Sequence, residues 1–169
     1  MLRRRSRRDD DGSPQGGNPF EGLRHIALTA VESGLSPPTA DHPDVAGVVI
    51  DIPRSNGAFA TVVALSDNTT SMYTSTGGGT IGAGAHAAVA SATQRLLLAV
   101  QQSLESFNEP DDGVLPADAV VRFHVLTPSG NQRGDIPEAS FWGRARHALM
   151  PVIAAAQAVI TAMREVSPD

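Results

Sequence analysis

Apolar residues along the chain follow two kinds of spacing. In three stretches they recur every three or four positions, as expected of helices that bury one face. In five shorter stretches β-branched and other apolar residues are adjacent or alternate, which is typical of strands in a covered sheet. The predicted helices span residues 19–33, 85–108 and 151–166, and the predicted strands span residues 46–52, 58–65, 69–75, 120–126 and 132–136.

The order of these elements is helix, three strands, helix, two strands, helix. Ser55-Asn56-Gly57 and Asp67-Asn68 are typical of tight turns between consecutive antiparallel strands. Single strands do not alternate with helices, so the pattern does not indicate parallel crossover units. The sequence therefore predicts an α+β fold (order α-βββ-α-ββ-α), in which helices pack on an antiparallel sheet of about five strands, in a single domain over residues 18–169.

Local signals mark the ends of the predicted helices. Asn18 is placed as the N-cap of the first helix, Pro19 at its first position, and Glu21 where it would complete a capping box. Gly34 is expected to cap the C-terminus of this helix. The central helix is expected to end near residue 108, because Pro110 cannot continue it.

A hydroxyl-rich strand leads through a glycine-dense segment into the central helix, and this segment is the candidate binding site. Five glycines within residues 77–84 allow positive φ angles and close approach of the backbone. Such a turn can present N–H groups and the positive end of the helix dipole to a phosphate or carboxylate. The predicted ligand-binding residues are Thr76, Gly77, Gly78, Gly79, Thr80, Gly82 and Gly84. No lysine follows, so this is not a Walker A loop, and the alternative is that the glycines allow a sharp turn and tight packing.

Two further groups of residues are candidates for an interaction surface. Alternation along the strand at residues 120–126 places Arg122 and His124 on the face opposite to Phe123, where they would contact an anion or an acidic partner. The second group, ahead of the final helix, consists of Trp142, Arg144 and Arg146. The alternatives are a partly covered sheet face with long polar side chains, and an aromatic residue that pins a loop over the core.

Composition restricts the chemistry and the partners. Of the 169 residues, 41% are hydrophobic and 18% are charged, which is ordinary for a globular protein. The chain has no cysteine and its 13 basic residues are all arginines, which excludes disulfides, thiolate catalysis, cysteine-held metals and lysine Schiff bases. The net charge of −5 makes nucleic acid an unexpected partner. No apolar run approaches the ~20 residues of a membrane span and no signal peptide is evident, so we expect a cytoplasmic protein without a membrane partner.

Charged residues outside these groups receive simpler interpretations. Residues 1–17 are rich in arginine and aspartate, with almost nothing apolar, and are predicted to form a disordered tail. His42 is expected to be solvated in a loop. His25 has no second imidazole at ligand spacing, so no metal site is predicted. Asp51 and Arg54 flank the first hairpin turn and could form an exposed pair that contributes little to stability.

The order of elements over residues 18–166 resembles that of the profilin-like and roadblock/longin group of small domains. In that group an antiparallel sheet carries a central helix between two sets of strands; the extra strand before the central helix departs from the usual roadblock order. The resemblance implies a homodimer that pairs through a sheet edge or a helix. At sequence level the runs YTSTGGG at residues 73–79, GAG at 82–84, VLT at 125–127 and AAAQAVI at 154–160 are also similar to an uncharacterised actinobacterial family.

The sequence favours a non-enzymatic interaction or regulatory module, without a cofactor, that binds itself or another protein through residues 132–136 or the alanine-rich final helix. The alternative is a small-ligand protein that holds a nucleotide or another phosphate at residues 77–84. A third hypothesis, acyl transfer, follows from a resemblance of this segment to the pyrophosphate loop of an acyltransferase fold, whose leading Arg or Gln is missing here. A hydrolase would require a serine and a histidine in contact, from Ser71, Ser75, His86 and His124.

Overall fold

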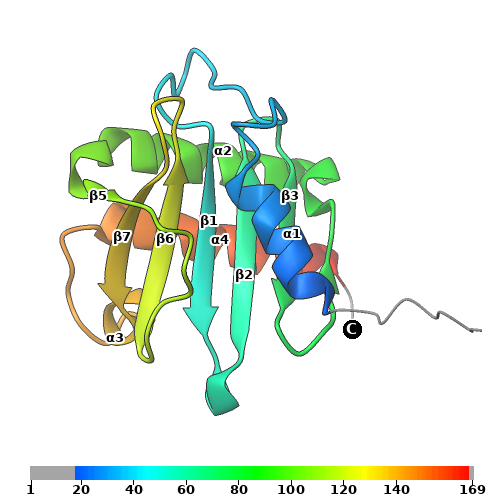
Figure 1. The fold of residues 1–169 in the computed structure, drawn as a ribbon, viewed down its shortest axis with the longest axis vertical. Helices are drawn as coiled ribbons and strands as arrows, with labels where there is room; N and C mark the ends of the chain where they lie inside the picture. Colours follow the sequence, from blue (N-terminus) through cyan, green and yellow to red (C-terminus); the bar gives the residue numbers. More distant parts are fainter. Residues whose placement is uncertain (1–17, 168–169) are drawn as a thin grey trace, which may run out of the picture.

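One antiparallel sheet of seven strands forms the centre of the protein in a computed structural model, which describes residues 18–167. The strands are β1 (Gly47–Pro53), β2 (Phe59–Leu65), β3 (Thr70–Thr74), β4 (Gly79–Thr80), β5 (Glu109–Pro110), β6 (Val120–Leu126) and β7 (Gln132–Pro137). They lie in the order β4-β3-β2-β1-β6-β7-β5 (Figure 1). The helices are α1 (Pro19–Leu28), α2 (Ala87–Gln102), α3 (Glu138–Phe141) and α4 (Met150–Val166). The fold is therefore α+β with an antiparallel sheet, as predicted.

The sheet has two strands more than the sequence predicts. β4 and β5 contain two residues each, which is too short for a pattern of alternation to show. The five longer strands agree with the predicted ranges to within one residue at each end. The sequence predicts that residues 132–136 form an edge of the sheet. In the structure β5 pairs with β7 at Gln132 and Arg133, so β7 is the outermost strand over only part of its length.

One face of the sheet is apolar and is covered by α2 and α4, which lie behind it in Figure 1. Phe123 is fully buried on this face, and its ring centroid lies 6.2 Å from those of both Phe107 and Phe141. Alternate strand residues supply the rest of this side of the core, namely Val48, Ile50, Ile52, Ala60, Val62, Ala64, Val121, Val125 and Ile136.

The opposite face is partly apolar and partly charged. Directly paired residues form one row across five strands, in the order Tyr73, Thr61, Asp51, Arg122 and Asp135. On this face α1 lies across β2 and β3 in Figure 1 and packs on apolar side chains of β1, β2 and β3. The segment at residues 111–115 covers the charged part of the same face, through contacts described below.

Helix α1 begins as predicted and ends earlier. The side chain of Asn18 accepts a hydrogen bond from the N–H of Phe20 at 3.1 Å, and Pro19 is the first helical residue. The helix ends at Leu28, and Gly34, with φ 69°, instead belongs to the turns at residues 29–34. The predicted tail at residues 1–17 lies outside the described residues, and none of the helices in residues 18–167 is long and apolar enough to cross a membrane.

The glycine-dense segment runs alongside β3 and packs against its backbone. A Cβ atom at Gly79 would overlap the carbonyl oxygen of Met72, and one at Gly84 would overlap the carbonyl oxygen of Asn68. These two positions therefore require glycine because backbone approaches backbone.

The variant Gly84→Ala tests this packing. We expect a loss of about 1–3 kcal/mol in the free energy of unfolding, because the backbone of Asn68 or the turn around residue 84 must move to admit the methyl group. Gly22→Ala is the matched control, since nothing lies within 4 Å of a Cβ atom there and alanine favours the helix. Urea unfolding followed by circular dichroism measures both, and equal stability of the two variants would contradict the packing.

Candidate functional site

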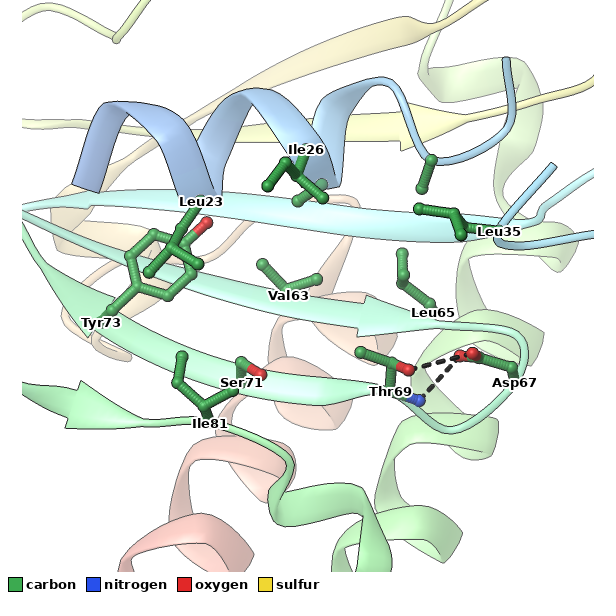
Figure 2. A pocket seen from close by; sticks show the side chains of 12 residues that line it. Leu23, Ile26, Leu35, Val63, Leu65, Asp67, Thr69, Ser71, Tyr73 and Ile81 are labelled. Carbon is green, nitrogen blue, oxygen red and sulfur yellow. Dashed lines mark hydrogen bonds between the residues drawn. The ribbon is translucent and has the colours of Figure 1, made fainter. Parts of the chain in front are cut away.

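An apolar cavity of about 250 Å³ lies between α1 and the strands β2 and β3. Figure 2 shows its lining side chains converging from the helix above and the sheet below. The lining includes Leu23 and Ala27 from α1, Val63 and Leu65 from β2, Tyr73 from β3, and Ile81 from the segment after β4. The small side chain of Ala27, which is buried, is part of this lining.

A second hollow of about 170 Å³ shares Leu23, Tyr73 and Ile81 with the first. It lies between the beginning of α1 and the turn that joins β3 to β4. The two hollows together are called the α1 groove below. Three of the glycines predicted to bind a ligand, Gly77, Gly78 and Gly79, line the second hollow.

Large aliphatic side chains are exposed around the α1 groove. Ile26 is 56% exposed, Leu35 is 54% exposed and Ile81 is 62% exposed, and all three line the first hollow. Single exposed apolar residues are ordinary, but a hollow surrounded by several of them is typical of a binding surface.

The other predicted ligand-binding residues do not converge with these glycines. The hydroxyl of Thr76 lies 3.2 Å from that of Thr74, and the hydroxyl of Thr80 lies 3.0 Å from that of Ser167, after α4. The N–H of Gly82 donates to the hydroxyl of Ser71 at 3.2 Å. Gly84 packs against Asn68 as described above. Among the described residues that line the α1 groove none is basic, so no side chain there would neutralise a phosphate.

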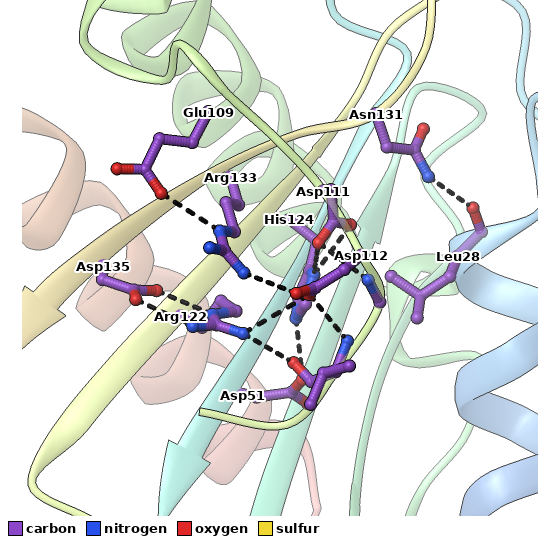
Figure 3. Close-up of polar contacts among 12 residues, drawn as sticks. Leu28, Asp51, Glu109, Asp111, Asp112, Arg122, His124, Asn131, Arg133 and Asp135 are labelled. Atoms are coloured by element: carbon purple, nitrogen blue, oxygen red, sulfur yellow. Dashed lines mark hydrogen bonds and ion pairs between the residues drawn. The ribbon is translucent and has the colours of Figure 1, made fainter. Parts of the chain in front are cut away.

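A cluster of charged side chains is buried on the other flank of α1, around Asp51 in the central strand (Figure 3). One carboxylate oxygen of Asp51 accepts a hydrogen bond from the hydroxyl of Thr61 at 2.6 Å. The other accepts from Nε of Arg24 at 2.9 Å and from Nη2 of Arg24 at 2.5 Å, and lies 2.8 Å from Nε2 of His124. Arg24 also donates to the main-chain carbonyl of Gly113 at 2.6 Å. Asp51 therefore does not form the predicted pair with Arg54.

His124 bridges two carboxylates. Its Nδ1 lies 2.9 Å from both oxygens of Asp111, and its Nε2 faces Asp51. Burial opposes the charged form of His124, but the hydrogen bonds with Asp111 and Asp51 outweigh it and raise the pKa of the imidazole. For Asp51 burial likewise opposes ionisation, and the hydrogen bonds from His124 and Arg24 outweigh it, so the pKa of this carboxyl is lowered. The two carboxylates therefore stabilise the charged form of His124, while Nη2 of Arg24 lies 3.2 Å from its Nε2.

Arg122 extends the cluster toward the edge of the sheet. Its guanidinium donates a bidentate pair of hydrogen bonds to the carboxylate of Asp135, at 2.7 and 2.8 Å. It also donates to the carbonyl of Val114 at 3.0 Å. The segment at residues 111–115 is thus attached to the sheet through Arg122 and His124 and to α1 through Arg24.

The buried cluster does not have the access that a catalytic site requires. Asp51 and His124 are fully buried, so a substrate would not reach either without movement of α1 or residues 111–115. Within residues 18–167 no hydrogen bond joins Ser71 or Ser75 to a histidine: Ser71 accepts from Gly82, and Ser75 accepts from the N–H of Phe59. Ser71 and His124 are separated by two strands, or about 14 Å at the usual strand spacing. The geometry supports a structural role for the cluster.

The two groups of candidate interface residues lie on opposite faces of the sheet. Arg122 and His124 belong to the buried cluster on the α1 face. Trp142 packs partly buried against the core of the other face, and its Nε1 donates to Glu138 at 3.2 Å. Arg144 and Arg146 are exposed in the loop before α4. The two groups of residues that the sequence suggested as an interface therefore do not form one continuous surface.

Two other histidines, His42 and His25, differ in burial. His42 is fully buried rather than solvated, because its ring nitrogens lie 2.7 Å from the carbonyl of Val45 and 3.0 Å from the side chain of Gln94. His25 is exposed on α1. Within residues 18–167 no group of three or more histidine, aspartate or glutamate side chains is arranged to hold a metal ion.

Comparison of the chain with protein-family models, with curated proteins and with solved structures finds no match. The resemblances noted from the sequence therefore stay predictions.

The charged cluster predicts a dependence of stability on pH. The pKa of His124 in the folded protein lies above its ordinary value of 6.5, so its contribution to stability is complete below pH 6.5 and is lost as pH rises through the folded pKa. The pKa of Asp51 lies below its ordinary value of 3.8, so its contribution is present above pH 3.8 and is lost as pH falls through the folded pKa. The free energy of unfolding should therefore decline above pH 6.5.

Two histidine variants separate this contribution from other titrations. His124→Gln should lower the free energy of unfolding by about 3 kcal/mol at pH 6, because it removes a buried charge between two carboxylates, and should flatten the decline at higher pH. His25→Gln, at an exposed position, should keep the decline. Urea unfolding at a series of pH values measures both, and a decline of the same size in His124→Gln would show that His124 is not its source.

Proposed function

We propose that the protein is a non-enzymatic interaction module that binds a short apolar segment of a partner protein in the α1 groove. The observation that carries this proposal is a groove between helix and sheet with three large aliphatic side chains exposed around it, Ile26, Leu35 and Ile81. Apolar anchors that enter such hollows supply most of the binding energy in many protein interfaces.

Charge supports a basic partner over a second copy of this chain. Among the described residues that line the groove, Asp67 carries a charge. It is exposed in the turn after β2. The whole chain has a net charge of −5, so two copies repel one another, whereas a segment with arginine or lysine beside its apolar residues is attracted. Within this proposal the module acts in the cytoplasm, and homodimerisation through the groove is the competing outcome.

The shape of the groove supports a segment longer than a single side chain. The two hollows follow α1 from Pro19 to the turn that holds Leu35, and they share Leu23, Tyr73 and Ile81. Two apolar side chains of one segment would fill one hollow each. The phosphate alternative has less support, because the glycines that line the second hollow have no basic neighbour in the groove.

Photo-cross-linking tests the proposal. A benzophenone amino acid replaces Ile26 at the groove or Leu98 on α2, which is 41% exposed and lies outside the groove. We expect the label at position 26, and not the label at position 98, to capture one partner from cells of the source. The partner is then purified and titrated against the protein.

Binding of the purified partner decides the role of the groove. Ile81→Glu should weaken it at least ~10-fold, since a charge is placed beside the apolar anchors. Leu98→Glu is the matched control and should leave it unchanged. Equal affinity for both variants would contradict the proposal. A cross-linked product that contains two copies of this chain and nothing else would show a homodimer instead.

A further inference from the structure

The hydroxyl of Tyr73 has no hydrogen-bond partner. Among the buried side-chain nitrogen and oxygen atoms of residues 18–167, this hydroxyl alone lacks a hydrogen bond. Tyr73 as a whole is 5% exposed. Buried polar groups in folded proteins are nearly always hydrogen-bonded, and an unsatisfied one carries a cost in free energy. This hydroxyl lies in a residue that lines both hollows of the α1 groove.

The neighbouring groups do not supply the missing partner. Both oxygens of Asp51, the acid nearest in the row across the sheet, are engaged by Thr61, Arg24 and His124. Burial, followed by the negative charge of Asp51, raises the pKa of Tyr73, so the phenol stays neutral and can donate a hydrogen bond. Among the described residues no group accepts a hydrogen bond from this phenol, so it is free to donate to an acceptor that enters the groove.

The ring that carries this hydroxyl borders the groove, and Leu23 covers it. In Figure 2 Leu23 lies over the ring of Tyr73, with the hydroxyl beside it under α1. Leu23 is partly buried and lines both hollows, so a ligand in the groove contacts the side chain that covers the phenol. The Tyr73 ring itself is held in place by an edge contact with Phe20, with centroids 5.8 Å apart.

Resting on the proposed function, we infer that the partner segment binds in an extended form and that one of its main-chain carbonyls accepts a hydrogen bond from Tyr73. An uncharged acceptor suits this position, because the negative charge of Asp51 behind the phenol outweighs the positive charge of Arg24, and Asp67 lies at the rim. An extended segment suits it because the carbonyls inside an α-helix are already hydrogen-bonded. Among the segments whose apolar side chains fit the groove, Tyr73 thus favours one that places a main-chain carbonyl beside its hydroxyl.

Stability of the free protein is the first test. Tyr73→Phe should leave the midpoint of thermal unfolding unchanged or raise it, because it removes a buried group that has no partner. A hydroxyl with an internal structural role would give a lower midpoint, and that result would overturn the inference. Ser71→Ala is the matched comparison, since this second groove hydroxyl accepts a hydrogen bond from Gly82 within the protein and its loss should lower the midpoint.

Binding of a small probe is the second test. N-Methylhexanamide carries one peptide group on an apolar chain, and hexanoate carries a carboxylate on a similar chain. We expect N-methylhexanamide to shift the amide resonances of Leu23, Ser71 and Gly78, with a Kd that rises ~5- to 10-fold in Tyr73→Phe and stays unchanged in Leu98→Glu, outside the groove. Hexanoate should bind at least ~10-fold more weakly than the amide to the wild-type protein. No binding of the amide, an unchanged Kd in Tyr73→Phe, or equal binding of hexanoate would overturn the inference.

The two proposals fail separately. A cross-linked partner that binds Tyr73→Phe as tightly as the wild-type protein overturns the inference about Tyr73 and leaves the proposed function intact. Binding of the amide that depends on Tyr73, without any protein captured at position 26, supports the subsite and overturns the protein-binding role of the groove.

Discussion

The carboxylate of Asp51 lies in the central strand of the sheet, where it has no access to water, and the arrangement of one whole face follows from its need for partners. A charge in this position is stable only when opposite charges and donors surround it closely. Arg24 comes from α1, Thr61 from β2 and His124 from β6, and His124 is in turn held by Asp111. Helix α1 and residues 111–115 are thereby attached to the same point of the sheet.

This attachment also explains why the α1 groove exists. The polar flank of α1 is held at the centre of the sheet by Arg24, whereas Leu23 and Ile26, on the other flank, line the hollow over β2 and β3. The helix has ten residues and leaves part of its side of the sheet uncovered. The segment after β4 approaches with Ile81 but does not close the space. The charged cluster therefore fixes the position of the helix, and the apolar groove is what remains beside it.

Much of the fold could be predicted from the sequence because the long elements have a clear period. The five longer strands, the cap at Asn18 and the faces of β6 follow from local patterns. The two-residue strands could not be predicted, since their pairing depends on neighbours far along the chain. The early end of α1 was missed for a related reason, because apolar residues continue at helical spacing in the turns at residues 29–34.

The candidate site was less accessible to sequence reasoning. A signal was present, because Asp51 and His124 interrupt runs of apolar residues in strands that are buried on both faces. The partners of these residues lie up to 100 positions away along the chain, so no local spacing reveals them. The glycines at residues 77–84 are predicted from the sequence as an anion site, and three of them line an apolar hollow in the structure. The groove itself depends on how α1 lies on the sheet, which no single segment encodes.

The close contact of Gly79 with β3, and of Gly84 with the turn before it, has a consequence for how the molecule behaves at high concentration. An unpaired outer strand offers a row of N–H and C=O groups to which another polypeptide can add, which is a common route to aggregation. Here a short strand and a close-packed glycine backbone occupy that row along β3. Addition of another strand to β3 is thereby hindered on this side, although an apolar surface lies open next to it.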